Sequence, residues 1–363
     1  MAIVRLTQID APKSKDVSPV FPNLALMKLA HWHRARGDEV VFTNSVFKDL
    51  FEPDHYDHVY GSAVFDVSCD RVSQFRREWP NAIASGTGTA DDGGITVESI
   101  IGTPLWQYEY YDYSIYPEVK ASFGFASRGC RLNCKFCGVQ RKEGKIVSVN
   151  SIANIWRGQP WPKKIHLLDN DFFGNPEWRA RIAEIREGAF RVCMSQGINI
   201  RLIDDEVAEA LASLRVEKTS KSGKVKKTWL FQEAGFKKTC LYTAWDNLGD
   251  EAIFFRGVDT LEHAGVPARH LMAYMLVGFD PSETWDKIWH RFDRMVERGI
   301  RPYPMVYDKA RTDLVAFQRW VISGLYRTKT WLEYRRETKS AESVAAFKRS
   351  RLGPSSHPGN PAP

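Results

Sequence analysis

Three closely spaced cysteines constrain this chain more than any other feature. Cys130, Cys134 and Cys137 lie within residues 127–138, SRGCRLNCKFCG, directly after a predicted strand. Thiolates at this spacing can wrap a compact metal centre, and iron–sulfur clusters are held by cysteine sulfur. Because a cubane has four irons and the loop offers three sulfurs, one iron would stay open to a ligand that is not protein. The spacing therefore predicts a [4Fe–4S] cluster ligated by these three cysteines.

Two other kinds of metal site are alternatives to this cluster. Structural zinc needs a fourth ligand, and its cysteines usually come as two separated C-x2-C pairs. An electron-transfer cluster would need four regularly spaced cysteines. Cys193 and Cys240 do not offer an obvious fourth ligand, because both lie in strand-like runs that indicate burial.

The composition indicates a globular chain outside the membrane. Residues 1–15 lack an apolar stretch after Arg5, as a secretory signal would require. The most apolar long run, 271–279, is far shorter than the ~20 residues that a bilayer needs. We therefore predict a cytoplasmic, reducing compartment, no membrane partner, and cysteines that act as ligands, catalysts or core residues. The length of 363 residues fits two compact domains, and the net charge of +7 favours acidic partners such as nucleic acid.

The first hundred residues alternate strand-like and helix-like segments. Asn23–Arg36 reads as an amphipathic helix that Gly37 closes. A glycine-rich loop, 86–94, follows the last strand, and an aromatic linker, 104–120, comes next. We expect the linker to pack against both neighbouring domains, with a stacking platform for bases as the alternative. The βαβ rhythm predicts a small open parallel sheet, a Rossmann-like domain over residues 1–103. Its expected strands are Ile3–Ile9, Glu39–Thr43, His58–Gly61 and Asn81–Ser85.

A second series of strands and helices runs over residues 121–310. It predicts a parallel, barrel-like sheet, a partial (β/α)6 TIM-type barrel in an α/β chain, whose functional groups cluster at the C-terminal ends of the strands. Residues 311–352 look helical, with Trp320, Trp331 and Tyr334 as packing anchors, and 353–363 reads as a disordered tail. The expected core strands are Ser122–Ala126, Lys164–Leu168, Arg191–Met194, Thr239–Ala244, His270–Val277 and Pro302–Val306. The expected helices are Ser151–Trp156, Pro176–Glu187, Asp204–Ser213, Asp250–His263 and Ser282–Arg298.

A basic segment, residues 215–229, interrupts this series. It carries six basic residues against one acid, Glu217, with Ser222 and Gly223 at its middle, a pattern typical of a hairpin. A solvated surface loop is one interpretation, and contact with phosphate or another acidic substrate is the other. The basic residues are Arg215, Lys218, Lys221, Lys224, Lys226 and Lys227.

The cysteine run closely resembles the radical S-adenosylmethionine (SAM) superfamily. The signature of that family is C-x3-C-x-φ-C, in which the symbol φ stands for an aromatic residue. Phe136 occupies this aromatic position. The resemblance implies that the open iron chelates the amino and carboxylate groups of SAM. One electron from the reduced cluster then cleaves the sulfonium to methionine and a 5′-deoxyadenosyl radical, which abstracts hydrogen from substrate. It also implies an electron donor such as flavodoxin or ferredoxin, while the substrate and the catalytic residues remain unassigned.

The resemblance also places SAM contacts after the second and third core strands. Asp169 and Asn170 follow the second strand, where the family often has a Gly-Gly-Glu-like segment that contacts the SAM amino group. This sequence departs from that motif. Gln196, Asn199 and Arg201 follow the third strand, where polar side chains commonly meet the ribose and the carboxylate. A planar guanidinium suits a carboxylate, although an ion-pairing arginine is the alternative for Arg201.

A later segment, 277–284 (VGFDPSET), resembles the family's strand near adenine. Gly278, followed by Phe279, would let the backbone approach the purine closely. The alternative is an ordinary strand-to-helix turn in which Ser282 caps the next helix. Asp246 would also lie at the end of a strand, with its role open.

The N-terminal domain resembles the cobalamin-binding-like domain that precedes many radical SAM cores. The likeness lies in residues 21–29 (FPNLALMKL), the glycine-rich loop and residues 112–117 (DYSIYP). The cobalamin motif D-x-H-x-x-G is missing, because Tyr56 stands where Asp belongs before His58 and Gly61. The resemblance thus implies a degenerate domain that positions substrate. Bound cobalamin would instead make methyl transfer to an unactivated carbon the natural reaction.

Two further functions stay open. A tRNA methylthiotransferase would carry three more N-terminal cysteines for a second cluster, whereas only Cys69 precedes Cys130. The alternative from another class is a nucleic-acid-binding protein with a structural metal, which would use the basic segment and the aromatic linker.

Overall fold

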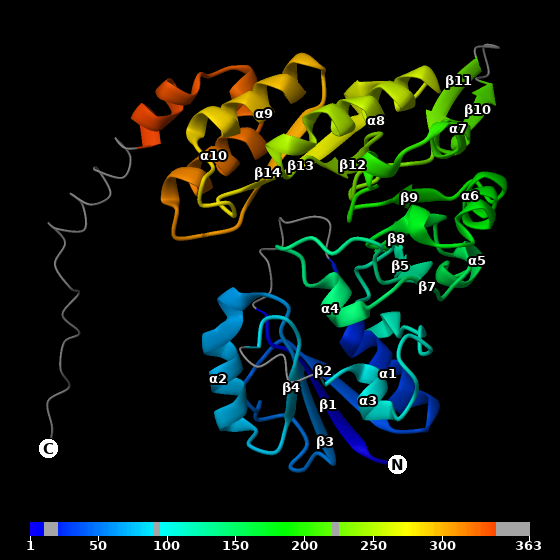
Figure 1. The fold of residues 1–363 in the computed structure, drawn as a ribbon. Coiled ribbons are helices and arrows are strands. Elements are labelled where there is room, and N and C mark those ends of the chain that lie inside the picture. The colour runs from blue at the N-terminus through cyan, green and yellow to red at the C-terminus, as the bar shows by residue number, and fades with distance from the viewer. Residues whose placement is uncertain (11–20, 90–94, 220–224, 339–363) are drawn as a thin grey trace, which may run out of the picture. The chain divides into compact units, whose positions relative to one another are not determined.

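The computed structural model describes residues 1–10, 21–89, 95–219 and 225–338. The chain is an α/β protein with several parallel sheets, and it divides into two compact units (Figure 1). Unit 1 comprises Met1–Ile198 and Ala210–Leu241, and unit 2 comprises Asn199–Glu209 and Tyr242–Pro363. The tail predicted over 353–363 lies outside the described residues, and the finer domain limits given above remain predictions.

Unit 1 begins with a four-stranded parallel sheet in the order β2-β1-β3-β4. The predicted open parallel sheet is therefore confirmed. Its first helix, α1, is capped by the Asn23 side chain, which accepts from Leu26 N, and Gly37 follows it with φ +83°. The elements are β1 (Ile3–Gln8), α1 (Leu24–Ala35), β2 (Glu39–Thr43), β3 (His58–Ser62), α2 (Cys69–Glu78), β4 (Ile83–Ser85) and α3 (Val97–Ile101).

Helices cover both faces of this sheet. Figure 1 shows α2 on one side of the strands and α1 with α3 on the other. Val4 and Leu6 of β1 pack with α1 and α3, whereas Phe75 of α2 packs with Ile9 on the opposite side. Because successive strand side chains alternate between faces, Arg5 lies on the α2 face, and it is fully buried.

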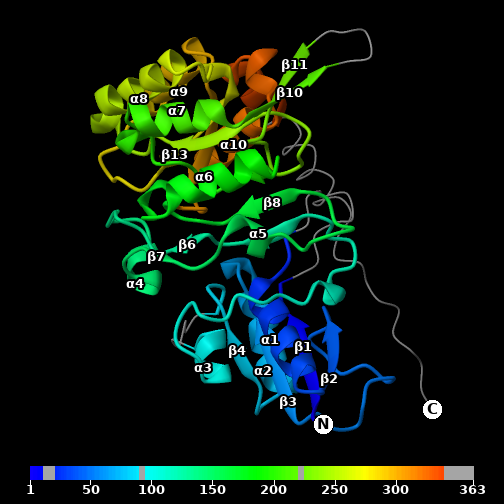
Figure 2. The same ribbon diagram turned by 90° about the vertical axis from the view of Figure 1, so that its right-hand side faces the viewer.

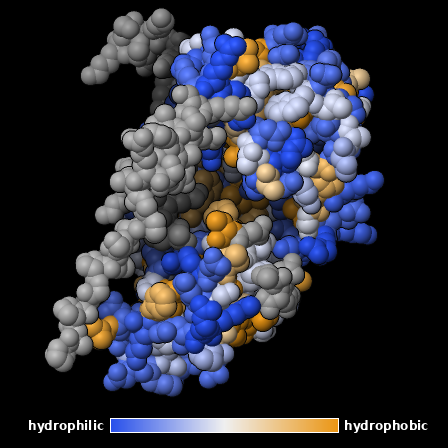
Figure 3. Space-filling model, turned by 90° about the vertical axis from the view of Figure 1, so that its left-hand side faces the viewer, coloured by the Kyte–Doolittle hydropathy of each residue, from blue (hydrophilic) through white to orange (hydrophobic). Residues whose placement is uncertain are grey.

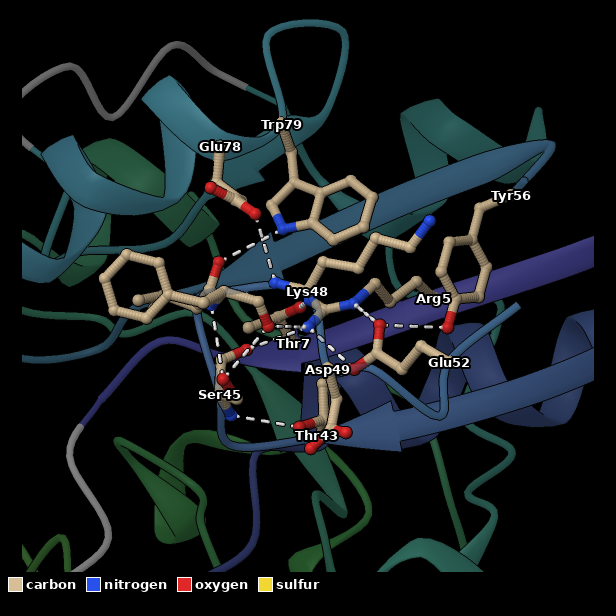
Figure 4. Close-up of polar contacts among 12 residues, drawn as sticks. Arg5, Thr7, Thr43, Ser45, Lys48, Asp49, Glu52, Tyr56, Glu78 and Trp79 are labelled. Atoms are coloured by element: carbon tan, nitrogen blue, oxygen red, sulfur yellow. Dashed lines mark hydrogen bonds and ion pairs between the residues drawn. The ribbon is translucent and has the colours of Figure 1, made fainter. Parts of the chain in front are cut away.

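Arg5 is the centre of a polar network inside the sheet's α2 layer (Figure 4). Its guanidinium forms an ion pair with Glu52 at 2.8 Å and donates to the carbonyls of Ser45 (3.1 Å) and Phe47 (2.9 Å). It also lies 4.5 Å from the ring centroid of Trp79. These contacts fasten the segment between β2 and β3 to the central strand.

The aromatic linker packs, within unit 1, against residues that precede it and residues that follow it in the chain. Tyr116 is buried in the same cluster as α1, and the Tyr113 hydroxyl accepts from Phe123 N at 2.8 Å. The guanidinium of Arg157 lies between the rings of Tyr113 (3.9 Å) and Trp161 (3.5 Å). The linker rings are therefore used largely for internal packing.

A second sheet of unit 1 has the order β5-β8-β9 and is parallel. Helices α5 and α6 lie beside it in Figures 1 and 2. A small antiparallel pair, β6 with β7, and the short helix α4 follow β5 along the chain. The elements are β5 (Ser122–Gly124), β6 (Ser127–Arg128), α4 (Val139–Glu143), β7 (Val147–Ser148), α5 (Ile152–Ile155), β8 (Lys164–Leu167), α6 (Trp178–Glu187) and β9 (Arg191–Cys193).

The basic segment forms the predicted hairpin. Strands β10 (Arg215–Thr219) and β11 (Val225–Trp229) pair in antiparallel register as a separate two-stranded sheet after helix α7 (Asp205–Ser213). Figure 2 shows both strands. Residues 220–224, including Lys221 and Lys224, lie outside the described residues.

Unit 2 contains a third sheet with the order β12-β13-β14, in which β13 and β14 pair in parallel. An aromatic cluster joins α9 to α10, and buried Trp320 and ring contacts of Trp331 and Tyr334 agree with the predicted anchors. The elements are β12 (Leu241–Ala244), α8 (Glu251–His263), β13 (Leu271–Val277), α9 (Trp285–Glu297), β14 (Arg301–Val306) and α10 (Thr312–Ile322).

The six expected core strands all form, each within a few residues of its predicted limits. They fall into two three-stranded sheets, and no closed barrel is present among the described strands. No helix in the described part of the chain is long and apolar enough to cross a membrane. The face drawn in Figure 3 is mainly hydrophilic, with hydrophobic atoms in small groups.

Candidate functional site

The cysteine loop runs from the end of β6 to the start of α4. Gly129 opens it with φ +89°, and a Cβ atom there would lie 2.4 Å from the Lys145 carbonyl oxygen. Cys130 N donates to the Gly144 carbonyl at 3.3 Å, and Cys137 N to the Cys134 carbonyl at 3.0 Å. Only glycine fits the first position, because the φ value and the close backbone both exclude a side chain.

We expect Gly129→Ala to destabilise the protein by about 1–3 kcal/mol, since it combines a left-handed residue with a backbone clash. Gly138→Ala in the same loop is the matched control. Gly138 has φ −88°, and an added Cβ would meet nothing closer than 3.8 Å. Urea unfolding of both variants measures the difference, and equal stabilities would contradict the assigned role of Gly129.

The three thiols differ in exposure but lie near one another. Cys130 and Cys134 are half-buried and Cys137 is exposed. Leu132 N donates to Cys130 Sγ at 3.4 Å, the kind of contact that tunes cluster sulfurs. Burial raises the pKa of the Cys130 thiol, and the nearby charges of Asp171, Cys134 and Cys137 raise it further.

The described residues contain no group of three or more His, Cys, Asp or Glu side chains that converges on one metal ion. A mononuclear site such as zinc needs that convergence. A cubane spreads its cysteines over separate irons, so its ligands are wider apart. The donor set of three neighbouring thiols on one loop is chemically suited to an iron–sulfur cluster.

An arginine–aspartate pair fastens the cysteine loop to the end of β8. Asp171, which is buried, accepts from Arg131 N (3.2 Å), Nε (2.8 Å) and Nη2 (3.0 Å). The hydrogen bonds that Arg131 donates to Asp171 raise the pKa of the Arg131 guanidinium. A Cβ at Gly174 would lie 2.6 Å from Asp171 Oδ2 and 2.7 Å from Arg131 Nε, so this glycine leaves room for the bidentate pair.

Asp169 and Asn170 also bind the cysteine loop and its approach. Buried Asp169 accepts from Ala126 N (3.0 Å) and from Ser127 N (2.5 Å) and Oγ (2.7 Å). Burial raises the pKa of this carboxyl to about 6. Asn170 Nδ2 donates to Glu143 at 3.1 Å. Asp169 and Asn170, the two predicted SAM contacts, thus have hydrogen-bond partners within the protein. Both lie after β8, beside the cysteine loop.

The other predicted contacts lie in both units. Phe136 is 37% exposed and Gln196 is exposed, both in unit 1. In unit 2, Arg201 forms an ion pair with Asp250 at 3.2 Å and donates to Asn199 at 3.3 Å. Arg201 therefore forms an ion pair within the protein, as the alternative interpretation expects. Its contact with the carboxylate of SAM remains a prediction.

Gly278 has φ +78°, and its N–H donates to Glu283 at 2.8 Å. Phe279 packs edge-on against Tyr307. The cap named in the alternative interpretation was wrong: Thr284, not Ser282, caps α9, because its side chain accepts from Lys287 N. The helix consequently begins at Trp285, and Ser282 N instead donates to Asp280.

A buried polar cluster in unit 2 was missed by sequence reasoning. Arg291 is 1% exposed and donates to the carbonyls of Trp245 (2.9 Å), Asp246 (3.1 Å) and Leu276 (2.9 Å), and it pairs with Glu283. Burial raises the pKa of Asp246, whose carboxylate accepts from Leu276 N at 3.0 Å. The sequence did contain one indication that Arg291 is buried, because this residue falls on the apolar stripe of α9. That stripe is formed by Ile288, Phe292 and Met295.

A buried histidine lies in the middle of the β5-β8-β9 sheet. His166 pairs in register with Phe123 and Cys193, and its ring stacks on Phe123 at 4.2 Å. It is 1% exposed, and among the described residues its Nδ1 has no hydrogen-bond partner. Burial lowers the pKa of His166 from 6.5 to about 4.

This depressed pKa predicts a loss of stability in acid. In the unfolded chain the imidazole takes up a proton near pH 6.5, whereas in the folded protein it does so only near pH 4. The free energy of unfolding is therefore highest above pH 6.5, and it falls as the pH drops from 6.5 to about 4. Between pH 7 and 5 the loss is about 2 kcal/mol. We expect His166→Phe to remove that loss in urea unfolding at both pH values. His55→Gln, at a residue whose side chain is 81% exposed, should keep the wild-type pH dependence; an identical dependence in both variants would contradict the prediction.

Comparison of the chain with protein-family models and with curated proteins found no match.

Proposed function

We propose that this protein is a radical SAM enzyme that cleaves S-adenosylmethionine reductively with a [4Fe–4S] cluster. The observation that carries the proposal is the loop of Cys130, Cys134 and Cys137, three neighbouring thiols at C-x3-C-x2-C spacing with an aromatic residue before the last. Cys130, Cys134 and Cys137 would hold the cluster, which would supply the single electron that splits the C5′–S bond of SAM into methionine and a 5′-deoxyadenosyl radical. The substrate of that radical is not specified.

The fold supports this reading at a coarser level. We infer that β5, β8, β9, β12, β13 and β14 are the six strands of a partial (β/α)6 barrel. The support is their order along the chain, the helices between them, and the parallel pairing of β5-β8-β9 and of β13 with β14. The cysteine loop follows the first of these strands, at the end where such folds carry their functional groups.

The chain's own residues would position the cluster. The Arg131–Asp171 pair fixes the first part of the cysteine loop, and Asp169 fixes the backbone that leads into it. Leu132 N donates to Cys130 Sγ, which stabilises a thiolate there. Gly278, Phe279, Gln196 and Arg201 remain the proposed contacts of SAM.

No cobalamin step is part of the proposal. Two glycines of the loop that carried part of the cobalamin-domain likeness, Gly86 and Gly88, are explained by internal packing, and Gly93 and Gly94 lie outside the described residues. A Cβ at Gly86 would lie 2.1 Å from the Ala63 carbonyl, and one at Gly88 would lie 2.4 Å from that of Phe65. Asp10, at the end of β1, accepts from Val64 N at 2.8 Å. We propose instead that the N-terminal sheet positions substrate.

Anaerobic reconstitution tests the function. The protein is loaded with iron and sulfide, reduced with dithionite and incubated with SAM. We expect about four irons and four sulfides per chain, a brown colour, and 5′-deoxyadenosine as a product. A colourless protein that binds zinc in place of iron, or loaded protein that leaves SAM intact, would refute the proposal.

A further inference from the structure

The segment that carries the three thiols is strongly basic. Residues 130–145 hold five basic residues and one acid, a local charge of +4. The acid, Glu143, is turned toward the protein, because its carboxylate pairs with Arg128 at 3.2 Å and accepts from Gly129 N at 3.0 Å. The exposed charged side chains of this segment, all of which the structure describes, are therefore positive. They form the positive patch, which consists of Arg131, Lys135, Arg141, Lys142 and Lys145.

Helix α6 of the same unit shows how a surface helix usually distributes its charges. Residues 177–187 hold three arginines and three glutamates, and ion pairs join the two sets. The thiol segment has no such balance. A cation in the last turn of a helix is favourable, which accounts for Arg141 and Lys142 in α4. Lys135 and Lys145 lie outside α4, so the helix does not explain them.

The fold brings both ends of the positive patch to the thiols. Lys145 lies beside the start of the cysteine loop, because a Cβ at Gly129 would lie 2.4 Å from the Lys145 carbonyl oxygen. Lys135 directly follows Cys134 in the sequence. Figure 2 shows α4 at an edge of unit 1, beside β6 and β7. The positive patch therefore borders the three thiols, of which that of Cys137 is exposed.

The proposed reaction gives a reason for charge at this place. Reductive cleavage of SAM uses one electron, and that electron comes from another molecule. If the donor is a protein, its redox group must come close to the cluster, so the donor has to dock beside the cysteine loop. Complexes between electron-transfer proteins bury little surface, and complementary charges steer their encounter. A positive surface selects a donor whose own surface is negative.

We propose that the positive patch docks an acidic electron-carrier protein. The carrier is oxidised by one electron, which passes to the cluster, and no covalent bond changes in this step. The inference rests on the proposed function, because only a reductive reaction needs such a partner. Nucleic acid is the other polyanion that a basic surface attracts, but its backbone is bound along a groove or stripe of basic residues. The patch belongs to one loop and one short helix, which favours a compact protein.

Two kinds of reductant separate docking from chemistry. Dithionite is small and needs no docking surface, whereas flavodoxin and ferredoxin are acidic proteins that carry one electron. Arg131 and Lys135 stay unchanged, because the first binds Asp171 and the second lies between two cysteines. The test variant of the full chain is Arg141→Gln/Lys142→Gln/Lys145→Gln. The matched control removes the same charge from exposed residues elsewhere in unit 1, as Arg179→Gln/Lys237→Gln/Lys238→Gln.

Anisotropy of fluorescein-labelled flavodoxin and ferredoxin gives Kd at about 50 and 200 mM salt. We expect the test variant to bind the carrier roughly tenfold more weakly than wild type at the lower salt. The KM for the reduced carrier in 5′-deoxyadenosine formation should rise by the same factor. With dithionite the test variant should form the product at the wild-type rate. The control should match wild type in every assay, and Arg141→Lys/Lys142→Arg/Lys145→Arg, which keeps the charge, should bind as wild type does.

Equal weakening in the test and control variants would overturn the docking proposal, because binding would then follow total charge. Wild-type protein that binds neither carrier, or a test variant that binds both as wild type does, would overturn it as well. Loss of dithionite-driven product in the test variant would place these residues in the cluster site instead. A labelled single-stranded RNA of about 20 nucleotides that binds through the patch while neither carrier does would assign the patch to nucleic acid. Absence of dithionite-driven product from the wild type would refute the proposed function itself, which the carrier-binding assay does not measure.

Discussion

Replacing Cys134 with alanine is expected to lower 5′-deoxyadenosine formation by a factor on the order of 100 or more. A loss of that size corresponds to at least about 2.7 kcal/mol of transition-state stabilisation. The physical reason is that one of three sulfur ligands disappears, which leaves two protein ligands for four irons. Cys134 is half-buried in a loop rather than in the core, so the fold should survive the change.

The control is Cys69→Ala, which removes an exposed cysteine at the start of α2. It should retain wild-type iron content, product formation and electron paramagnetic resonance signal. The Cys134 variant should lose all three while its circular dichroism spectrum stays unchanged. Turnover by the Cys134 variant at the rate of the Cys69 variant would remove the cluster assignment.

The second large effect concerns stability: Arg5→Ala should destabilise unit 1 by about 3–5 kcal/mol. This is the usual result when one partner of a buried ion pair is removed. The side chain of Glu52 is 10% exposed and would keep an uncompensated charge, and the carbonyls of Ser45 and Phe47 would lose their donor (Figure 4). The stacking on Trp79 would also be lost.

An exposed pair in the same unit provides the comparison. Arg34 pairs with Asp112, and the Arg34 side chain is 40% exposed. Pairs of this kind contribute about 0–1 kcal/mol, so Arg34→Ala should have a small effect. Urea denaturation of Arg5→Ala, of Glu52→Gln and of the double variant measures the coupling between Arg5 and Glu52, and Arg34→Ala is measured beside them. An Arg5 variant as stable as the Arg34 variant would show that the network does not hold the layer together.

Local pattern was enough to place most elements. The alternating and apolar runs at Glu39–Thr43 and around Leu271–Val277 depend on neighbours in sequence, and the strands formed there as predicted. Gly37 ended α1 because its φ of +83° is a property of glycine itself. The residue that caps α9 was harder to predict, since Ser282 and Thr284 are both good cap residues. The choice depended on the hydrogen bond from Ser282 to Asp280, which local pattern does not reveal.

Burial of charge could not be predicted from the same patterns. Arg5 alternates with Val4 and Leu6, which is typical of a strand with one face in water. Its partner Glu52 lies 47 positions away in the sequence, and that pairing exists only after β2, β3 and α2 come together. The same applies to Arg291, whose acceptors lie at the ends of two other strands.

The sequence by itself determined the strand and helix order, the hairpin, and the grouping of three cysteines, because each depends on residues close together in the chain. Tertiary structure alone decided which polar side chains are buried and what they bind. Asp169 meets Ser127, and Asp171 meets Arg131, only where the end of β8 lies against the segment after β5. The physical reason is that a buried polar group must find a partner wherever the fold places one, and that partner has no fixed distance along the sequence.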